Sequence, residues 1–192
     1  NLGSAQFSLA IGGKPELYAS SEITFATLQG KFPKGKYLEE ALYYLGESLY
    51  AQGKKEQAVS NYERLVKEFA NSKRRPDALY ALGVAQEELG KHADAGKSYD
   101  LYVKEFAQLP LANEVRMRKA ETMLQSGDVV QAAKLFAEVA KVRDFKAVDH
   151  ALSRQACCLA KQEKFVEAGT LYARVVNDFQ KASFAPDAMV SP

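Results

Sequence analysis

The side chains of this 192-residue sequence that most often act as nucleophiles or metal ligands are two histidines and two cysteines. His150 and Cys157 are seven residues apart, so on a helix they would share one face about 10 Å apart. That separation is too long for a Cys–His nucleophile or for two ligands of one ion. We therefore expect Cys157 to pack or to line a groove, and the adjacent Cys158 to be a small buried residue.

Three other segments resemble chemical motifs but lack essential parts of them. Gly12-Gly13-Lys14-Pro15 lacks the spacing, the preceding strand and the following Ser or Thr of a phosphate-binding loop, so it is interpreted as a turn. His92 follows Gly90-Lys91 and is interpreted as a residue at a helix start. Lys73-Arg74-Arg75 carries too few charges to indicate nucleic-acid binding. The sequence thus predicts no enzyme, no catalytic residue, no metal site and no cofactor.

The composition is typical of a folded protein, with 47% hydrophobic and 26% charged residues. A formal net charge of +2 gives little reason to expect nucleic acid as the main partner. Charged residues interrupt every apolar run before it could cross a bilayer, so no membrane span is predicted. The sequence begins at Asn1 without a signal peptide, and we expect it to be a piece of a longer protein.

Several residue types recur at a step of about 37 residues. Each unit contains an alanine, an aromatic residue four positions after it, and a small residue twelve positions before it. In three of the four units a glycine lies five positions before the alanine. The alanines are Ala58, Ala95, Ala132 and Ala168; the aromatics Tyr62, Tyr99, Phe136 and Tyr172; the small residues Gly46, Gly83, Ala120 and Ala156; the glycines Gly53, Gly90 and Gly127. Glu163 stands near the fourth glycine position. Such markers in one register predict a structural repeat.

Each marker has a physical role in a helical hairpin. The apolar residues between the glycines follow helical spacing, and each glycine provides the left-handed cap that ends a first helix. The paired small residues allow the two helix axes to cross closely, and we expect the following aromatic to fill the wedge where the helices diverge. Pro76 and Pro186 suit the first turn of the next helix.

These units resemble tetratricopeptide repeats, which have small residues and an aromatic at these offsets. The resemblance implies an all-α fold: an α-solenoid of antiparallel helical hairpins in a right-handed superhelix of about 10–11 helices. Arg116, Lys119 and Gln155 depart from the pattern, since the family places large apolar residues at these first-helix positions. Their aliphatic stems are expected to pack while the polar heads reach solvent.

The markers also predict how the chain is organised. Residues 1–31 are interpreted as a degenerate N-terminal hairpin, with a first helix ending near Gly12-Gly13 and a second beginning near Pro15. Residues 32–182 contain four repeats, at about 35–71, 72–108, 109–145 and 146–182. Residues 183–192 are expected to begin a further helix.

A narrower resemblance covers residues 32 to 106. The segments Phe32-Pro33-Lys34-Gly35 and Phe69-Ala70-Asn71-Ser72, and the run from Leu45 to Tyr50, are similar to bacterial cell-envelope tetratricopeptide proteins. These are the CpoB-type (YbgF) periplasmic coordinators of cell-wall synthesis and the BamD-like lipoproteins of outer-membrane assembly. The resemblance implies a periplasmic or envelope location and a protein-binding role; a cytoplasmic scaffold is the alternative.

In the family, first helices line the concave face, so the register predicts a protein-binding surface. It combines carboxylates with tyrosines and flexible apolar residues, which favours a basic or apolar peptide; the alternative interpretation is a solvated acidic face. The predicted residues are Glu40, Tyr43, Glu47, Tyr50, Asp77, Tyr80, Val84, Glu87, Glu114, Met117, Glu121 and Leu124, with His150, Ser153 and Cys157 in the fourth unit. Lys and Asn are missing there, which disfavours the subtype that binds acidic chaperone tails.

The predicted function is a non-catalytic scaffold that binds a peptide or helix of a partner protein. Two alternatives remain open from the sequence. One is end-to-end self-assembly into homo-oligomers through the first fifteen residues and the region after Pro186. The other is a regulatory region of a longer enzyme.

Overall fold

The computed structural model describes residues 2–179, which form ten α-helices and no β-strand. In order they are α1 (Leu2–Ile11), α2 (Leu17–Lys31), α3 (Leu38–Ala51), α4 (Lys55–Glu68), α5 (Arg75–Glu88), α6 (His92–Phe106), α7 (Ala112–Gln125), α8 (Val129–Val139), α9 (Val148–Lys161) and α10 (Phe165–Asp178). The all-α prediction is confirmed, and ten helices agree with the 10–11 expected.

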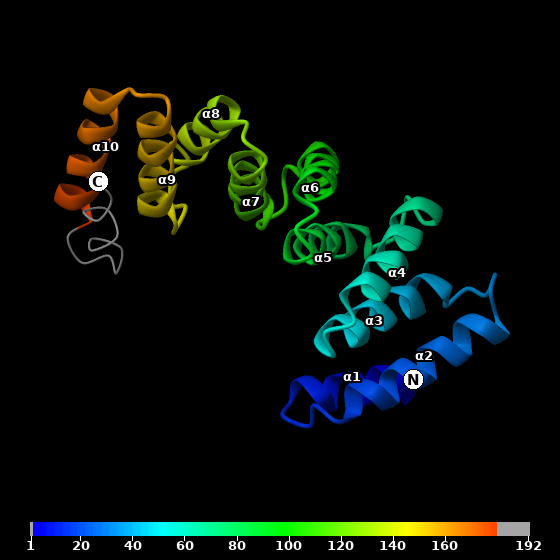
Figure 1. The fold of residues 1–192 in the computed structure, drawn as a ribbon. Coiled ribbons are helices and arrows are strands. Elements are labelled where there is room, and N and C mark those ends of the chain that lie inside the picture. The colour runs from blue at the N-terminus through cyan, green and yellow to red at the C-terminus, as the bar shows by residue number, and fades with distance from the viewer. Residues whose placement is uncertain (1, 180–192) are drawn as a thin grey trace. The chain divides into compact units, whose positions relative to one another are not determined.

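The chain divides into two compact units. Unit 1 ends at Tyr102 and unit 2 begins at Val103. Within each unit, consecutive helices pack as hairpins, and a first helix also packs on the second helix before it, as α3 does on α2 and α9 on α8 (Figure 1). The sequence-based repeat boundaries stay predictions, and the helix expected within 183–192 lies outside the described residues.

The turns inside the hairpins follow the glycine prediction. Gly53, Gly90 and Gly127 have φ of 77°, 71° and 88°, the left-handed conformation that costs glycine little. After each, the next backbone N–H bonds five residues back, as from Lys54 to the Leu49 carbonyl at 2.9 Å. Between α9 and α10, Glu163 takes the left-handed conformation at φ 62°, so the turn forms without glycine.

The close crossing of the two helices is built differently from the expectation. An added Cβ on Gly46 would lie 2.4 Å from the Tyr62 ring, and one on Gly83 would lie 2.2 Å from the Tyr99 ring. Each tyrosine therefore lies directly against its glycine instead of filling a wedge beyond the crossing. The ring needs the space that a side chain on the first helix would occupy.

The N-terminal hairpin also packs an aromatic ring against a glycine, but the two residues stand at other positions of the repeat. Its first helix ends at Ile11 and its second begins at Leu17, close to the predicted turn. Here Gly3 faces the Phe25 ring, at 2.8 Å from an added Cβ. The hairpin is thus a shifted version of the following units, which agrees with its degenerate sequence.

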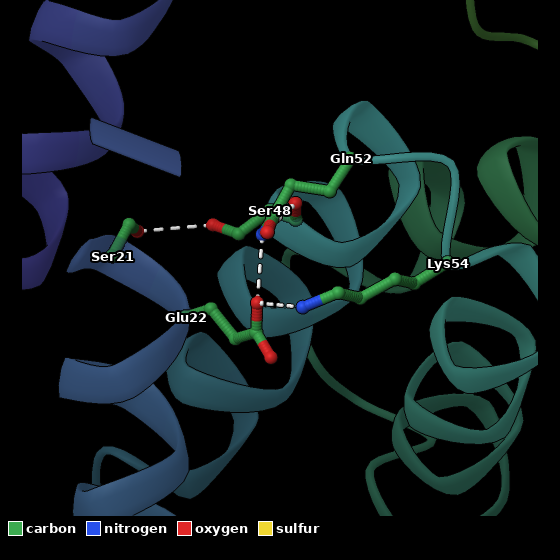
Figure 2. A network of polar contacts seen from close by, with 5 residues as sticks. All are labelled: Ser21, Glu22, Ser48, Gln52 and Lys54. Carbon is green, nitrogen blue, oxygen red and sulfur yellow. Dashed lines mark hydrogen bonds and ion pairs between the residues drawn. The ribbon is translucent and has the colours of Figure 1, made fainter. Parts of the chain in front are cut away.

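A polar network joins α2 to α3 (Figure 2). The buried Ser48 hydroxyl donates to Ser21 Oγ at 3.0 Å, and Ser21 Oγ donates to the Gly3 carbonyl at 3.3 Å. Gln52 Nε2 and Lys54 Nζ both donate to Glu22 Oε2, at 2.8 and 2.7 Å. The hydrogen bond from Lys54 lowers the pKa of Glu22 below its ordinary value. Because buried hydroxyls must be paired, these contacts fix how the N-terminal hairpin docks on α3.

Unit 2 has its own core, built around the fully buried Phe136, Ala132 and Ala120. Arg116, Lys119 and Gln155, which depart from the family pattern, are half-buried. This agrees with aliphatic stems that pack against the helices and polar ends that reach solvent. Arg116 Nη1 donates to Asn113 Oδ1 at 2.6 Å, which satisfies its head group on its own helix.

The glycine–tyrosine contact leads to a test of the fold. Gly83→Ala should lower the free energy of unfolding by about 1–3 kcal/mol, because the new methyl group would overlap the buried Tyr99 ring. Gly30→Ala in α2 is the matched control: an added Cβ there meets nothing within 4 Å, so it should be neutral or stabilise by about 0.5–1 kcal/mol. Chemical denaturation followed by circular dichroism measures both. Equal effects of the two changes would contradict the packing.

Candidate protein-binding surface

The first helices of unit 1 carry an aromatic cluster that surrounds Tyr44. Its ring stacks on Phe25 of α2 at a centroid distance of 5.5 Å and an interplanar angle of 15°. It also contacts Phe7 of α1 at 5.2 Å and Tyr43 of α3 at 5.4 Å. Phe7 and Phe25 are buried, whereas Tyr43 and Tyr44 keep part of their surface accessible. The cluster therefore fixes two tyrosines at the surface of α3.

Arg74, immediately before α5, covers these two tyrosines. Its guanidinium carbon lies 5.1 Å from the centroids of both the Tyr43 and the Tyr44 ring, a cation–π geometry. Its Nη2 donates to Tyr44 Oη at 2.7 Å, and its Nη1 lies 3.5 Å from Asp77 Oδ2. The residues Tyr43, Tyr44, Glu47, Arg74 and Asp77 are called the α3–α5 surface from here on.

Glu47 is the most enclosed carboxyl of the α3–α5 surface. It accepts a hydrogen bond of 2.6 Å from Tyr62 Oη, whose ring passes through the helix crossing from α4. Burial raises the pKa of Glu47 above its ordinary value of 4.5, and the nearby Asp77 raises it further. The hydrogen bond from Tyr62 and the charge of Arg74 act in the opposite direction. Burial, with the Glu47 charge, also raises the pKa of Tyr62.

The second repeat of unit 1 also pairs a buried tyrosine with a carboxylate of the first helix, but the carboxylate lies about one helical turn further along that helix. Tyr99 Oη donates to Glu87 Oε2 at 2.6 Å, so a buried tyrosine again reaches a carboxylate of the first helix. The neighbouring Glu88 accepts from Tyr50 Oη at 2.8 Å and pairs with Lys55 at 3.0 Å. The Glu88 contacts tie α3 and α4 to α5, and the two tyrosine hydrogen bonds occupy Tyr50 and Glu87, which the sequence suggested for a partner.

In unit 2 a two-bond ion pair takes the carboxylate that was predicted to face a partner. Arg154 Nε donates to Glu121 Oε1 at 2.6 Å, and its Nη2 donates to Glu121 Oε2. The Glu121 carboxylate raises the pKa of Arg154. Because both side chains are mostly covered, this fork holds α9 to α7 far more firmly than an exposed pair would.

The twelve predicted binding residues therefore fall into three groups. Glu47, Glu87, Glu114 and Glu121 already accept hydrogen bonds or ion pairs from the chain, Glu114 from Arg118 at 3.4 Å. Met117 lies in the core of unit 2, only 6% exposed. The third group is at least partly accessible: Glu40, Tyr43, Tyr50, Asp77, Tyr80, Val84 and Leu124. Within it, Tyr50 donates to Glu88 and Asp77 pairs with Arg74.

Sequence reasoning missed two residues of the α3–α5 surface, Tyr44 and Arg74. The repeat register assigned Tyr43 to the predicted binding face but left out its neighbour Tyr44. The tyrosine side chain is long enough to reach this face from a flanking position of the helix. The signal for Arg74 was present in the Lys73-Arg74-Arg75 run, which was weighed only against nucleic acid. The two arginines separate in the structure: Arg75 is 7% exposed and donates to the Val66 carbonyl, whereas the Arg74 side chain is 38% exposed.

The cysteines have the surroundings expected from the sequence. Cys158 is fully buried, and burial raises the pKa of its thiol to about 11. Cys157 is half-buried on α9. Across residues 2–179 no group of three or more His, Cys, Asp or Glu side chains could hold a metal ion.

Comparison with known proteins supports the fold inferred from the hairpins. Residues 43–110 match the sequence model of the tetratricopeptide repeat. The fold is a tetratricopeptide-type helical solenoid. It is similar to a tetratricopeptide repeat protein from Parabacteroides merdae, with 15% identity, a TM-score of 0.76, and coverage of 97% of this chain and 70% of that one.

A second similar structure is MamA from Desulfovibrio magneticus, residue 41 to its end. It has 12% identity and a TM-score of 0.72, over 99% of this chain and 96% of that one. At such identities the likeness shows the fold alone. No significant match was found among curated protein sequences. None of the described helices has the length and apolar character needed to cross a membrane.

The enclosed carboxyl predicts a pH-dependent stability effect. Because the pKa of Glu47 is higher in the folded chain, the folded state holds a proton that the unfolded state has released as pH rises above about 4.5. This group therefore opposes folding increasingly as pH rises through its folded pKa. Glu47→Gln keeps an acceptor for Tyr62 but cannot ionise, so its stability relative to the unmodified chain should increase across that window.

Urea unfolding between about pH 4 and pH 8 measures this difference. Glu63→Gln on the exposed side of α4 is the matched control and should show no such trend. A difference between Glu47→Gln and the unmodified chain that stays constant with pH would contradict the enclosed environment of Glu47.

Proposed function

We propose that this chain is a non-catalytic protein-interaction scaffold that binds a peptide or helix of a partner on its first helices. The observation that carries the proposal is the α3–α5 surface, where two tyrosine rings are held rigid by buried aromatics and remain partly accessible. Rigid aromatic rings provide contact area at a low cost in conformational entropy. The tetratricopeptide-type fold supports the same role, since such folds present helices of this kind to protein partners.

The preferred partner is one with basic and apolar side chains. Asp77 is exposed, and Tyr43, Tyr80 and Val84 supply apolar area beside it. The carboxylates already paired within the chain, Glu87 and Glu121 among them, contribute to holding the helices more than to attracting a ligand. The surface offered to a partner is therefore more aromatic and less acidic than the sequence suggested.

The cellular setting is part of the same proposal. The resemblance of residues 32–106 to CpoB-type and BamD-like proteins supports a role in a bacterial cell-envelope assembly or a cell-wall process. Its location would then be the periplasm or cell envelope, with a cytoplasmic scaffold as the alternative.

A second candidate function is self-association through the N-terminal hairpin. Leu2, Leu9 and Ile11 of α1 are all more than half exposed, at 67%, 51% and 64%. Exposed apolar side chains gathered on one short helix are typical of an interaction surface. Pairing of two copies through α1 would bury these three residues.

The proposed function is tested by removing two rings of the first helices. The double variant Tyr43→Ala/Tyr80→Ala should fail to recover the partner that the tagged unmodified chain recovers from cells of the source organism. With the purified partner, the Kd should rise at least tenfold, as expected for the loss of aromatic anchors worth about 2 kcal/mol. Helicity must be unchanged.

The matched control is Phe32→Ala/Tyr37→Ala, which removes two exposed aromatics from the segment between α2 and α3 and should bind normally. Unchanged binding by the Tyr43→Ala/Tyr80→Ala variant would remove the first-helix proposal. Recovery of an untagged copy of the chain itself, lost on Leu2→Glu/Leu9→Glu, would instead favour self-association.

A further inference from the structure

Arg74 is bound by its own chain in the way that a protein would bind a guanidinium from outside. Its planar head lies over two aromatic rings, donates to a phenol oxygen, and has a carboxylate at its edge. We propose that the α3–α5 surface is a receptor site for an arginine side chain of the partner, and that Arg74 occupies this site until the partner displaces it. This inference rests on the proposed function and specifies its ligand chemistry.

The groups around the site match a guanidinium better than any other common side chain. The Tyr43 and Tyr44 faces attract a flat cation, and arginine stacks on such rings because its charge is delocalised and weakly hydrated. Asp77 and Glu47 supply two carboxyl groups near one cation, so the set carries a surplus of negative charge when both are ionised. These carboxyl groups can therefore pair with an incoming guanidinium that takes the place of Arg74.

The ion pair that holds Arg74 is weaker than the ion pair that holds Arg154. Its approach to Asp77 is a single pair at 3.5 Å between residues three apart, and its side chain is 38% exposed. Arg154, by contrast, forms the two-bond fork with Glu121. Arg74 also stands at the amino end of α5, where a positive charge is disfavoured by the helix dipole. Release of Arg74 therefore breaks one long ion pair, together with the hydrogen bond to Tyr44 and the two ring contacts, and a guanidinium from the partner would replace these contacts.

The site occurs once in the repeat series, which separates it from the general architecture. At the 37-residue step, the positions equivalent to Arg74 are Tyr37 and Leu111, and neither carries a charge. The Tyr43-Tyr44 pair becomes Tyr80-Ala81 in the next repeat, so the second ring is lost. A feature needed only for stacking repeats would recur with them. The two-ring site is instead specific to α3 and α5.

Occupation by Arg74 has a consequence for affinity. A ligand that must displace an internal group binds more weakly by the fraction of time that the site is open. Removal of the Arg74 charge should therefore tighten the binding of an external arginine, opposite to the loss expected if Arg74 itself recognised the partner. The direction of the change distinguishes the two roles.

The experiment titrates the full chain with the peptide acetyl-Gly-Ser-Gly-Arg-Gly-Ser-Gly-amide and follows the ring resonances of isotope-labelled tyrosine by NMR. For Arg74→Gln we expect the Kd to fall about tenfold relative to the unmodified chain, the factor for an internal group seated about 90% of the time. The Tyr43 and Tyr44 resonances should shift. The same peptide with Gln in place of Arg should bind neither protein.

Two variants serve as controls. Arg64→Gln removes an arginine that pairs with Glu68 on α4, away from the site, and should leave the Kd unchanged. Arg74→Gln/Tyr43→Leu should lose the tightened binding. The proposal is overturned if Arg74→Gln binds the arginine peptide no better than the unmodified chain does, or binds the glutamine peptide equally well.

A measurement on the unmodified chain keeps the proposal testable if Arg74→Gln does not fold. Saturating arginine peptide should move the Nε resonance of Arg74, and an unmoved resonance at saturation overturns displacement. The arginine site and the first-helix binding surface are refuted by different results. Loss of the natural partner by Tyr43→Ala/Tyr80→Ala, together with no gain in Arg74→Gln, would refute only the arginine site.

Discussion

The contact between a glycine on one helix and a tyrosine ring on the next is the constraint on which unit 1 depends. At Gly46 and Gly83 the ring of the second helix occupies the space of the missing side chain, so the ring packs directly against the backbone of the first helix. The same packing directs each phenol from the second helix across to the first helix. Its hydroxyl reaches a carboxylate of the first helix, Glu47 or Glu87, and a packing feature thereby positions polar groups on the surface where a partner is proposed to bind.

Much of the fold follows from the sequence because its signals are local and periodic. The glycines that end the first helices need only a left-handed residue, and the recurring alanines need only a close crossing, so both could be placed by counting. The shifted register of the first hairpin could not, since only the packing of Gly3 against Phe25 reveals which residue takes the small position in that helix.

The binding surface was less predictable because it depends on which charged side chains are already paired with other side chains of the same chain. Spacing placed Glu47, Glu87 and Glu121 on the inner face, but it could not show that tyrosines from the second helices and Arg154 already engage them. Tyr44 was missed because its long side chain reaches the surface from a position that a helical wheel assigns to the flank. Arg74 was missed because it precedes α5 and its basic run was weighed only against nucleic acid. The outcome is a surface whose aromatic rings, more than its carboxylates, are available to a partner.

The most direct test of the account is a double-mutant cycle between the two members of one crossing. The free energy of unfolding would be measured for the unmodified chain, Gly46→Ala, Tyr62→Leu and the double variant. If the Tyr62 ring occupies the space beside Gly46, the cost of the added methyl group should largely disappear once the ring is gone, with a coupling energy of about 1 kcal/mol or more. Additivity of the two changes to within about 0.5 kcal/mol would contradict the central contact.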